Sequence, residues 1–571
     1  MPDQKLENQL NLALEATPDE REHSGELNIG YNPEERTWEL IVKHSESIDE
    51  LKELGIQIFP LINNYSILTV PESLITTVSN LPQIEYIEKP KRLFFAVNQA
   101  KAVSCIDYVQ VEGSAYNPYL TGRGTIVAVI DSGIDYYHSD FRNEDGSTRI
   151  LELWDQTIDR VYTREEINEA LNRGSRAAAR EVVSSVDGSG HGTAVAGIAA
   201  GNGRENNGQY RGVAFESELL IVKMGVPDPE GFPRTTELMK AIDFVVRRAV
   251  DYHMPVAINI SFGNTYGSHD GTSLLETYID AVSNYGRVVI AVGTGNEGGR
   301  GGHISGTLVE GNPVDVELSI SPYETGFSVQ LWKAYTDEFQ INLITPSGVD
   351  FGPLIPAASP QTLTYEDMRI LIYYGEPSPY SQAQEIYFDF IPRGNYLSSG
   401  IWTFRLTPRK IVSGRYDFWL PASSILNQST YFLGSTQDTT LTIPSTAAMV
   451  ISVGAYDDAY QYYADFSGRG YTRLTDQVKP DLAAPGVNIV APRNGGGYAP
   501  VTGTSFATPF VTGSAALLME WGIIQGHDPY LYGEKVKAYL RRGARQLPGF
   551  PAWPNPQLGY GALCLRDSLP L

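Results

Sequence analysis

Cysteine is nearly absent from this chain, whose 571 residues include only Cys105 and Cys564. Two thiols so far apart in the sequence do not form the dense disulfide framework of a small secreted protein. We therefore expect two buried free thiols. The low cysteine content fits a reducing interior or a cysteine-poor bacterial compartment.

Basic residues and long apolar runs are also scarce. The chain holds 43 Lys and Arg against 67 Asp and Glu, a net charge of −24. A phosphate-binding face needs the opposite surplus, so we expect no nucleic-acid partner. No apolar run reaches the ~18 residues of a membrane span, and residues 1–28 lack the apolar core of a signal peptide. We therefore expect no membrane span, no signal peptide and a cytoplasmic location.

The length predicts two to four domains, and the first of them is small. After a polar arm of about 30 residues, the patterning predicts a βαββαβ order over residues 37–90. Its predicted strands are 37–45, two within 56–70, and 84–89, and its predicted helices are 47–55 and 71–81. This order is typical of a ferredoxin-like α+β fold, which by itself indicates no function.

From Gly122 onward, apolar strands alternate with helices. The predicted strands include 125–133, 218–225, 255–263 and 287–296, with helices at 191–201, 235–253 and 274–286 between them. This alternation predicts an α/β domain with a doubly wound parallel sheet. Its functional residues are expected at the carboxyl ends of the strands.

The alternation stops near residue 303, where about 135 residues of period-2, aromatic-rich strands begin. They predict an antiparallel all-β domain, a jelly roll or sandwich, inserted within the α/β domain. The predicted domains are 1–99, 100–302, 303–437 and 438–571. We expect the inserted domain to be non-catalytic and to cover or brace its host, or to hold a partner.

Three short motifs carry residue types that together support nucleophilic catalysis. Asp131 ends one predicted strand, His191 opens a helix, and Ser505 opens another helix after Gly503. A serine hydroxyl needs a base near neutral pKa to take its proton, and a carboxylate to orient that base. The order Asp, His, Ser is the one found in subtilisin. These residues are the predicted catalytic triad.

An acyl-transfer site also needs donors aimed at the developing oxyanion. Asn296 follows the apolar run of residues 287–292, within Gly-Thr-Gly-Asn-Glu-Gly. Its side-chain amide and the backbone N–H of Ser505 are the candidate donors. A plain turn residue is the alternative for Asn296.

The motifs DSGID, HGT, SFG, GTGNEG and GTSFATP resemble those of the subtilase superfamily across roughly residues 120–300 and 440–565. The resemblance implies that Ser261, Phe262, Gly263 and Gly295 line the pocket for the substrate residue before the scissile bond. It also implies that residues 1–99 are a propeptide, bound in the cleft as the enzyme's own ligand. The other expected partner is a protein or peptide substrate.

The order of propeptide, catalytic domain and jelly-roll insert is similar to that of the clostridial Csp germination proteases. This resemblance implies a serine endopeptidase that processes its own propeptide and activates another zymogen during spore germination. By the same resemblance, the expected location is cytoplasmic or spore-associated. Two alternatives remain, an intracellular housekeeping subtilase and a propeptide-blocked pseudoprotease that acts as a sensor or scaffold.

Autocleavage is expected within Phe95–Lys101, with the bond between Gln99 and Ala100 favoured. A ferredoxin-like domain that ends near Lys89 leaves an extended tail, which can lie in the cleft as an added strand. The new terminus at Ala100 is expected to be polar and to swing away. A plain interdomain linker is the alternative.

The remaining polar candidates receive structural interpretations. His138 and Asp135 are expected to be structural neighbours of Asp131. Asp145 and Asp187 lie in Gly-containing loops, where ordinary turns are favoured over calcium sites because neither loop follows an EF-hand pattern. No histidine spacing suits a metal centre, so we expect no metal and no cofactor, with structural calcium left open.

Overall fold

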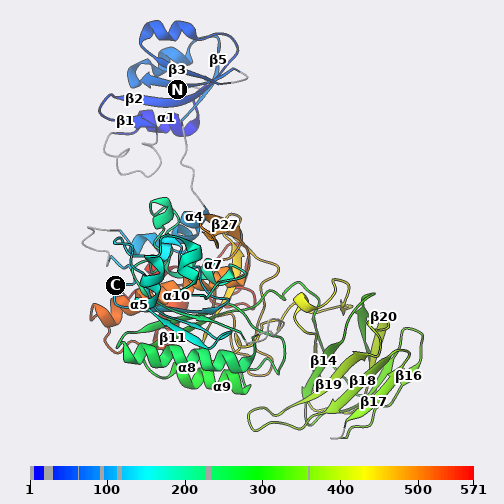
Figure 1. Ribbon diagram of the computed structural model, residues 1–571. Helices are drawn as coiled ribbons and strands as arrows, with labels where there is room; N and C mark the ends of the chain where they lie inside the picture. The colour runs from blue at the N-terminus through cyan, green and yellow to red at the C-terminus, as the bar shows by residue number, and fades with distance from the viewer. Residues whose placement is uncertain are drawn as a thin grey trace. The chain divides into compact units, whose positions relative to one another are not determined.

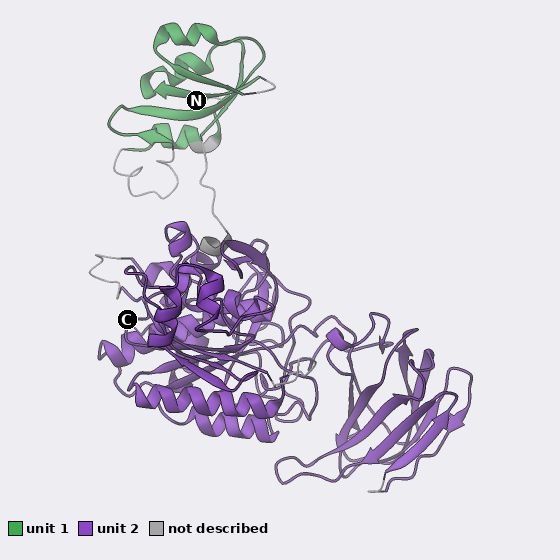
Figure 2. Ribbon diagram, viewed as in Figure 1, with its two compact units in different colours: residues 1–95 green, residues 96–571 purple. Residues whose placement is uncertain are grey.

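The computed structural model describes residues 5–17, 30–61, 64–89, 96–111, 119–225, 233–357 and 360–570. The chain divides into two compact units, residues 1–95 and 96–571 (Figure 2).

The N-terminal unit is built on an antiparallel sheet. Its four main strands lie in the order β5 (Ile84–Glu88), β2 (Thr37–His44), β4 (Tyr65–Pro71) and β3 (Gln57–Leu61). In chain order this is 4-1-3-2, the arrangement of the split βαβ fold, so the ferredoxin-like prediction is confirmed.

Helical segments connect these strands where they were predicted, with one difference in type. The first is a 3₁₀ helix, Asp49–Leu54, which Gly55 ends at φ 79°. The second runs from a 3₁₀ turn at Glu72–Leu74 into α3 (Ile75–Ser79). In the predicted arm, α1 (Asn8–Glu15) adds Leu10 and Ala13 to the core of this unit, and β1 (Tyr31–Asn32) pairs with β2.

The second unit is organised around a nine-stranded sheet. Its parallel strands are, in order, β7 (Ile150–Asp155), β9 (Glu218–Lys223), β6 (Ile126–Asp131), β10 (Val256–Ile260), β11 (Val288–Gly293), β23 (Ile451–Asp457) and β25 (Leu482–Pro485). The antiparallel strands β8 (Arg160–Thr163) and β24 (Tyr462–Tyr463) complete it. The predicted doubly wound parallel sheet is therefore confirmed.

Helices cover both faces of this sheet (Figure 1). One face carries α7 (His191–Ala200) and α10 (Thr504–Met519), and the other carries α8 (Thr235–Asp251) and α9 (Leu274–Ser283). Because side chains alternate along a strand, β6 contributes Val127 and Val129 to the first core and Ile126, Ala128 and Ile130 to the second. Both faces of β6 are thus buried, as its continuous apolar run predicts.

Four further helices belong to the second unit. They are α5 (Arg164–Leu171), α6 (Arg176–Arg180), α11 (Gly533–Gly543) and α12 (Leu565–Ser568). Among the described residues, only Thr504–Ile524 has the length and composition of a membrane span. This segment contains α10, and 89% of its most apolar window is buried inside the protein, as in a core helix.

Two antiparallel sheets stand between β11 and β23, where the all-β insert was predicted. One comprises β12 (His303–Thr307), β21 (Arg415–Trp419), β14 (Phe327–Ala334), β19 (Ala383–Pro392), β18 (Met368–Tyr374) and β17 (Gln361–Tyr365). The other comprises β16 (Asp350–Phe351), β15 (Glu338–Ile344), β20 (Gly400–Lys410), β13 (Val314–Ile320) and β22 (Tyr431–Phe432). Alternate residues such as Trp402, Phe404 and Leu406 fill a core of their own between the sheets.

A buried polar cluster joins the insert to its host. Asp417 of β21 accepts hydrogen bonds from Arg473 Nε at 2.7 Å and Arg415 Nε at 3.2 Å, and contacts His303 Nε2 at 3.2 Å. Burial raises the pKa of Asp417, but the His303 contact and the arginine charges hold it at about 2. Trp419 stacks on His303 and on His269 of the α/β part. A buried charge is costly unless it is paired, so this cluster supports a bracing role for the insert.

The prediction of free thiols is wrong, because Cys105 and Cys564 form a disulfide with Cα atoms 4.8 Å apart. Cys105 follows α4 (Ala96–Val103), and Cys564 directly precedes α12. A hydrogen bond of 2.9 Å from Leu565 N to Ser104 O joins the same two segments. The prediction failed because it relied on the distance between the two cysteines along the sequence, whereas the fold brings the start and the end of this unit together.

Removing this disulfide is expected to destabilise the second unit. The Cys105→Ala/Cys564→Ala variant should lose roughly 2–5 kcal/mol of unfolding free energy, because the unfolded chain is no longer cross-linked. Urea unfolding of wild type and variant, each with and without reductant, measures this loss. Reductant should lower the midpoint of the wild type and leave that of the variant unchanged. Two reactive thiols in the untreated wild type would contradict the assignment.

Candidate active site

The triad residues lie at the ends of three elements of the second unit. Asp131 is the last residue of β6, His191 the first of α7, and Ser505 the second of α10. Gly192 allows α7 to approach the loop after β6, because a Cβ there would stand 2.2 Å from the carbonyl oxygen of Gly133. The local sequence thus brings His191 close to Asp131.

Asp131 and His191 form the central contact of the site. His191 Nδ1 lies 2.7 Å from Asp131 Oδ1, which also accepts the backbone N–H of Ser132 at 2.7 Å. Asp131 is buried. Burial lowers the pKa of His191, but the charge and hydrogen bond of Asp131 outweigh it and raise that pKa above its ordinary value. A buried carboxylate on Nδ1 leaves Nε2 as the nitrogen that can act as base.

Asp187 organises the turn that precedes His191. Its carboxylate accepts hydrogen bonds from Gly190 N at 2.9 Å, Thr193 N at 2.9 Å and Ser132 Oγ at 2.8 Å. Asp145 accepts hydrogen bonds from the neighbouring Ser147 N and Oγ. Both carboxylates therefore accept hydrogen bonds from their own loops. The part of the chain that the structure describes holds no group of three or more His, Cys, Asp or Glu placed for a metal ion.

Ser505 stands at the N-terminal end of α10, beside the loop after β10. Its hydroxyl donates to Ser261 O at 2.9 Å, and Ser261 Oγ donates back to Ser505 O at 3.0 Å. The His191 ring contacts the ring of Phe506, with centroids 5.2 Å apart. The helix that carries Ser505 therefore contacts His191 through the neighbouring Phe506. The Ser505 hydroxyl donates to the Ser261 carbonyl in this structure. It must break that hydrogen bond before it can give its proton to His191. Such contacts often form only once substrate is bound.

Asn296 is held by the helix that carries the nucleophile. Its side-chain Oδ1 accepts Thr504 N at 3.1 Å and Thr504 Oγ1 at 3.2 Å. With Oδ1 occupied, the donor Nδ2 remains for a ligand, and it lies 3.5 Å from where a Cβ on Gly503 would stand. This orientation fits an oxyanion donor better than a plain turn residue.

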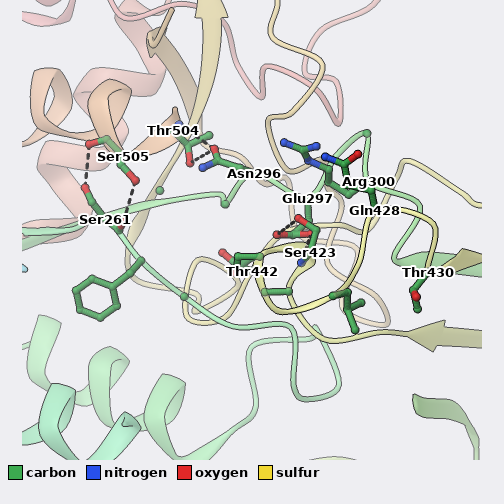
Figure 3. A pocket seen from close by; sticks show the side chains of 18 of the residues that line it. Ser261, Asn296, Glu297, Arg300, Ser423, Gln428, Thr430, Thr442, Thr504 and Ser505 are labelled. Atoms are coloured by element: carbon green, nitrogen blue, oxygen red, sulfur yellow. Dashed lines mark hydrogen bonds between the residues drawn. The ribbon is translucent and has the colours of Figure 1, made fainter. Parts of the chain in front are cut away.

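A cleft of about 850 Å³ opens beside these residues (Figure 3). Ser505, Asn296 and the four predicted pocket residues Ser261, Phe262, Gly263 and Gly295 all line it. Sequence reasoning missed the opposite wall, which comes from the insert. That wall consists of Ala422, Ser423, Ser424, Leu426, Asn427, Gln428 and Thr430, and the α/β part adds Arg300 and Thr442 to the lining.

Glu297 connects this wall to the oxyanion side of the cleft. Its two carboxylate oxygens accept Ser423 N at 3.1 Å and Ser423 Oγ at 3.2 Å. Burial raises the pKa of Glu297, and the Ser423 hydrogen bonds offset part of that rise. The inserted domain therefore contacts the residue next to Asn296, in addition to the bracing contacts described above.

His138 and Asp135 hold structure near Asp131, as predicted. Buried His138 accepts Asp140 N on Nδ1 at 3.2 Å and places Nε2 3.1 Å from Glu205. Asp135 pairs with Arg176 through both carboxylate oxygens.

The expected autocleavage segment differs from its prediction in conformation. Pro90–Phe95 lie outside the described residues, but Ala96–Val103 form α4 and are not extended. Ala-rich sequence favours helix. Ala100 is fully buried, and Lys101 Nζ donates to Gln110 Oε1 at 2.8 Å and to Gly212 O at 3.2 Å. The expectation of an extended tail up to Gln99 is therefore wrong for the intact chain from Ala96 onward, and the position of the cut and the movement of a new terminus remain predictions.

Comparison with known proteins agrees with this geometry. The model of the Subtilase family matches residues 122–322 and 422–561, and the model of the Csp protease B prodomain matches residues 4–91. The gap between the two subtilase matches falls inside the inserted sheets. The chain belongs to the subtilase family, and its N-terminal unit is a prodomain of the Csp protease B type.

Individual relatives support the same assignment. The solved structure of the Clostridium perfringens CspB protease is 36% identical, with a TM-score of 0.77, over 82% of this chain and 96% of that one. The minor extracellular protease Vpr of Bacillus subtilis is 25% identical over 77% of this chain and 50% of its own length. The serine protease AprX of Bacillus subtilis is 32% identical over 23% of this chain and 32% of its own. The chain thus spans about half, or less, of these two curated relatives.

The raised pKa of His191 predicts how activity varies with pH. Only neutral imidazole can accept the Ser505 proton, so kcat/KM should rise with pH to a plateau, with a midpoint above about 6.5, the ordinary histidine value. The profile is measured between roughly pH 5 and 9 on a peptide without ionisable side chains. His253→Gln, at an exposed histidine, is the matched control and should leave the midpoint in place. A wild-type midpoint below the ordinary histidine value would contradict the role of Asp131.

Proposed function

We propose that this protein is a serine endopeptidase that hydrolyses peptide bonds through an acyl-enzyme on Ser505. The 2.7 Å contact of His191 with buried Asp131, beside Ser505, carries the proposal. His191 takes the hydroxyl proton as Ser505 attacks the scissile carbonyl, and then gives it to the leaving amine. Water then attacks the acyl-enzyme by the same route and releases Ser505.

The cleft residues supply the remaining requirements of acyl transfer. Asn296 Nδ2 and the backbone N–H of Ser505 donate to the oxyanion as it forms. The N-terminus of α10 adds favourable electrostatic potential to that charge. Ser261, Phe262 and Gly263 contact the substrate residue before the scissile bond. Charge stabilisation and substrate positioning thus each have a named group that lines the cleft, and His191 at the start of α7 supplies proton transfer.

We propose further that the enzyme cleaves its own prodomain, between Gln99 and Ala100, and that the cut prodomain occupies the cleft. The matches to a protease and to a Csp protease B prodomain in one chain support this. Ala100 is fully buried, and a new ammonium group there would be costly to keep out of water. Cleavage at this bond therefore requires the first turn of α4 to unwind. The disulfide at Cys105 would then keep the new terminus attached.

Mass spectrometry of the purified chain tests autocleavage. Wild type should yield fragments of about 99 and 472 residues, and Ser505→Ala a single chain of 571. The same fragments from the Ser505→Ala protein would show that another protease makes the cut. An uncut wild type that hydrolyses peptides would refute self-processing and leave the endopeptidase assignment standing.

For the natural role, we propose activation of another zymogen during spore germination, in a cytoplasmic or spore-associated location. The resemblance to the Csp germination proteases and the similarity to the Clostridium perfringens CspB protease support it. The paired Asp131 and His191 favour an active enzyme over the sensor or scaffold alternative.

A further inference from the structure

The cleft wall opposite Ser505 carries an arginine that the catalytic mechanism does not use. Arg300 and Glu297 are the two charged residues that line the cleft. Glu297 is engaged by Ser423 through both oxygens. Arg300 is exposed, and its guanidinium makes no hydrogen bond or ion pair among the residues that the structure describes, although its charge lowers the pKa of the neighbouring Glu297. Figure 3 shows Arg300 and Gln428 on the side of the pocket away from Ser505 and Ser261.

The surroundings of Arg300 are mostly polar. The insert contributes Ser423, Ser424, Asn427, Gln428 and Thr430, and the α/β part adds Thr442. Asn427 and Thr430 are tied to the buried carboxylate of Glu324. Gln428, which is exposed, makes no hydrogen bond among the described residues. Two donor side chains, one charged and one neutral, are therefore available to a ligand in this wall.

A substrate side chain that enters between Ser261–Gly263 and Gly295 faces this wall. We propose that Arg300, assisted by Gln428 of the insert, selects for glutamine or glutamate before the scissile bond and against lysine. An oxygen acceptor at the end of a side chain of that length can receive hydrogen bonds from the guanidinium and the amide. A lysine ammonium offers only donors and carries the same charge as Arg300.

One observation and one earlier proposal agree with this selectivity. Glu297 would repel a substrate carboxylate, but burial raises its pKa and Ser423 occupies both of its oxygens. The autocleavage bond proposed above follows Gln99, and a cut at that bond would place an oxygen acceptor of the chain itself at this position. The inference rests on the proposed endopeptidase function and adds its residue preference.

Four quenched fluorescent peptides that differ only in the residue before the scissile bond test the proposal. That residue is Gln, Glu, Leu or Lys, and the enzyme is the full-length purified protein. Active sites are counted by fluorophosphonate labelling of Ser505, so that misfolded variants do not distort kcat/KM. Wild type should cleave the Gln and Glu peptides best and the Lys peptide worst.

Three substitutions separate a specificity role from a structural one. Arg300→Gln should lower kcat/KM on the Gln and Glu peptides roughly 10- to 100-fold, since a hydrogen bond to a charged group is lost, and should spare the Leu peptide. Arg300→Glu should make kcat/KM on the Lys peptide higher than kcat/KM on the Glu peptide. Gln428→Ala should lower kcat/KM by a smaller factor, and only on the Gln and Glu peptides. Arg247→Gln, at an exposed α8 arginine paired with Asp243, is the control and should change none of the four.

The outcomes also separate this inference from the proposed function. A wild type that hydrolyses none of the peptides and resists labelling at Ser505 would refute the endopeptidase assignment and this preference with it. Equal losses on all four peptides in Arg300→Gln would make Arg300 a structural residue. If Arg300→Gln ranks the four peptides by kcat/KM in the same order as wild type, the proposed role of Arg300 in selectivity is refuted and the endopeptidase assignment stands.

Discussion

Replacing Ser505 with alanine is expected to abolish peptide hydrolysis. The variant keeps Asp131, His191 and Asn296 but has no atom that can attack the scissile carbonyl. In subtilisin, whose triad has the same order, loss of the serine or the histidine costs about 10⁶-fold in kcat. We expect a loss of that order here, measured as kcat on a peptide substrate with the active protein present at known concentration.

The structure indicates that this substitution leaves the fold intact. Ser505 Oγ gives up one hydrogen bond to Ser261 O, whereas the bond from Ser261 Oγ to Ser505 O remains. One hydrogen bond is worth about 1 kcal/mol, so the melting temperature should change little. Ser514→Ala is a matched control on the same helix, because that buried hydroxyl has no partner among the described residues. A Ser505→Ala protein that keeps more than a few per cent of activity, once contaminants are excluded, would refute the triad.

The positions of Asp131, His191 and Ser505 at the ends of their elements could be predicted because each depends on a short local pattern. Asp131 ends a strand that is buried on both faces, and His191 and Ser505 each lie at the start of a helix that a glycine precedes. Parallel strands end at a common edge, so residues after different strands converge there without any long-range information. The ferredoxin-like unit and the inserted sheets were predictable for a similar reason, since their period-2 alternation fixes the buried face of each strand.

Contacts between distant segments could not be predicted in this way. The disulfide joins Cys105 to Cys564 because the fold brings the two termini of the second unit together. The contact of Ser423 with Glu297 arises because a turn of the insert lies against the cleft. Neither pair has a local signature. The helix at Ala96–Val103 is different, since its alanines favour helix and the expectation of an extended tail gave that propensity too little weight.

Replacing Asn296 with alanine is expected to lower kcat far more than it raises KM. The amide donates to charge that develops only in the transition state, so its loss leaves substrate binding almost unchanged. The corresponding loss in a subtilisin is roughly 10²- to 10³-fold in kcat, and we expect a similar value. Steady-state kinetics on one peptide, with Ser505 labelling to count active sites, separates kcat from KM.

The Thr504 contacts suggest a second Asn296 variant, which tests how the side-chain amide is oriented. Asn296 Oδ1 accepts Thr504 N and Thr504 Oγ1, and this contact turns Nδ2 away from Thr504. In Asn296→Asp the carboxylate could keep the Thr504 contacts but would present negative charge to the oxyanion, so it should lower kcat at least as much as alanine does. Asn284→Ala, at an exposed residue that ends α9, is the control for loss of a turn asparagine and should leave kcat unchanged. An unchanged kcat in Asn296→Ala would show that Asn296 holds only the turn, and the backbone N–H of Ser505 would then be the remaining candidate donor.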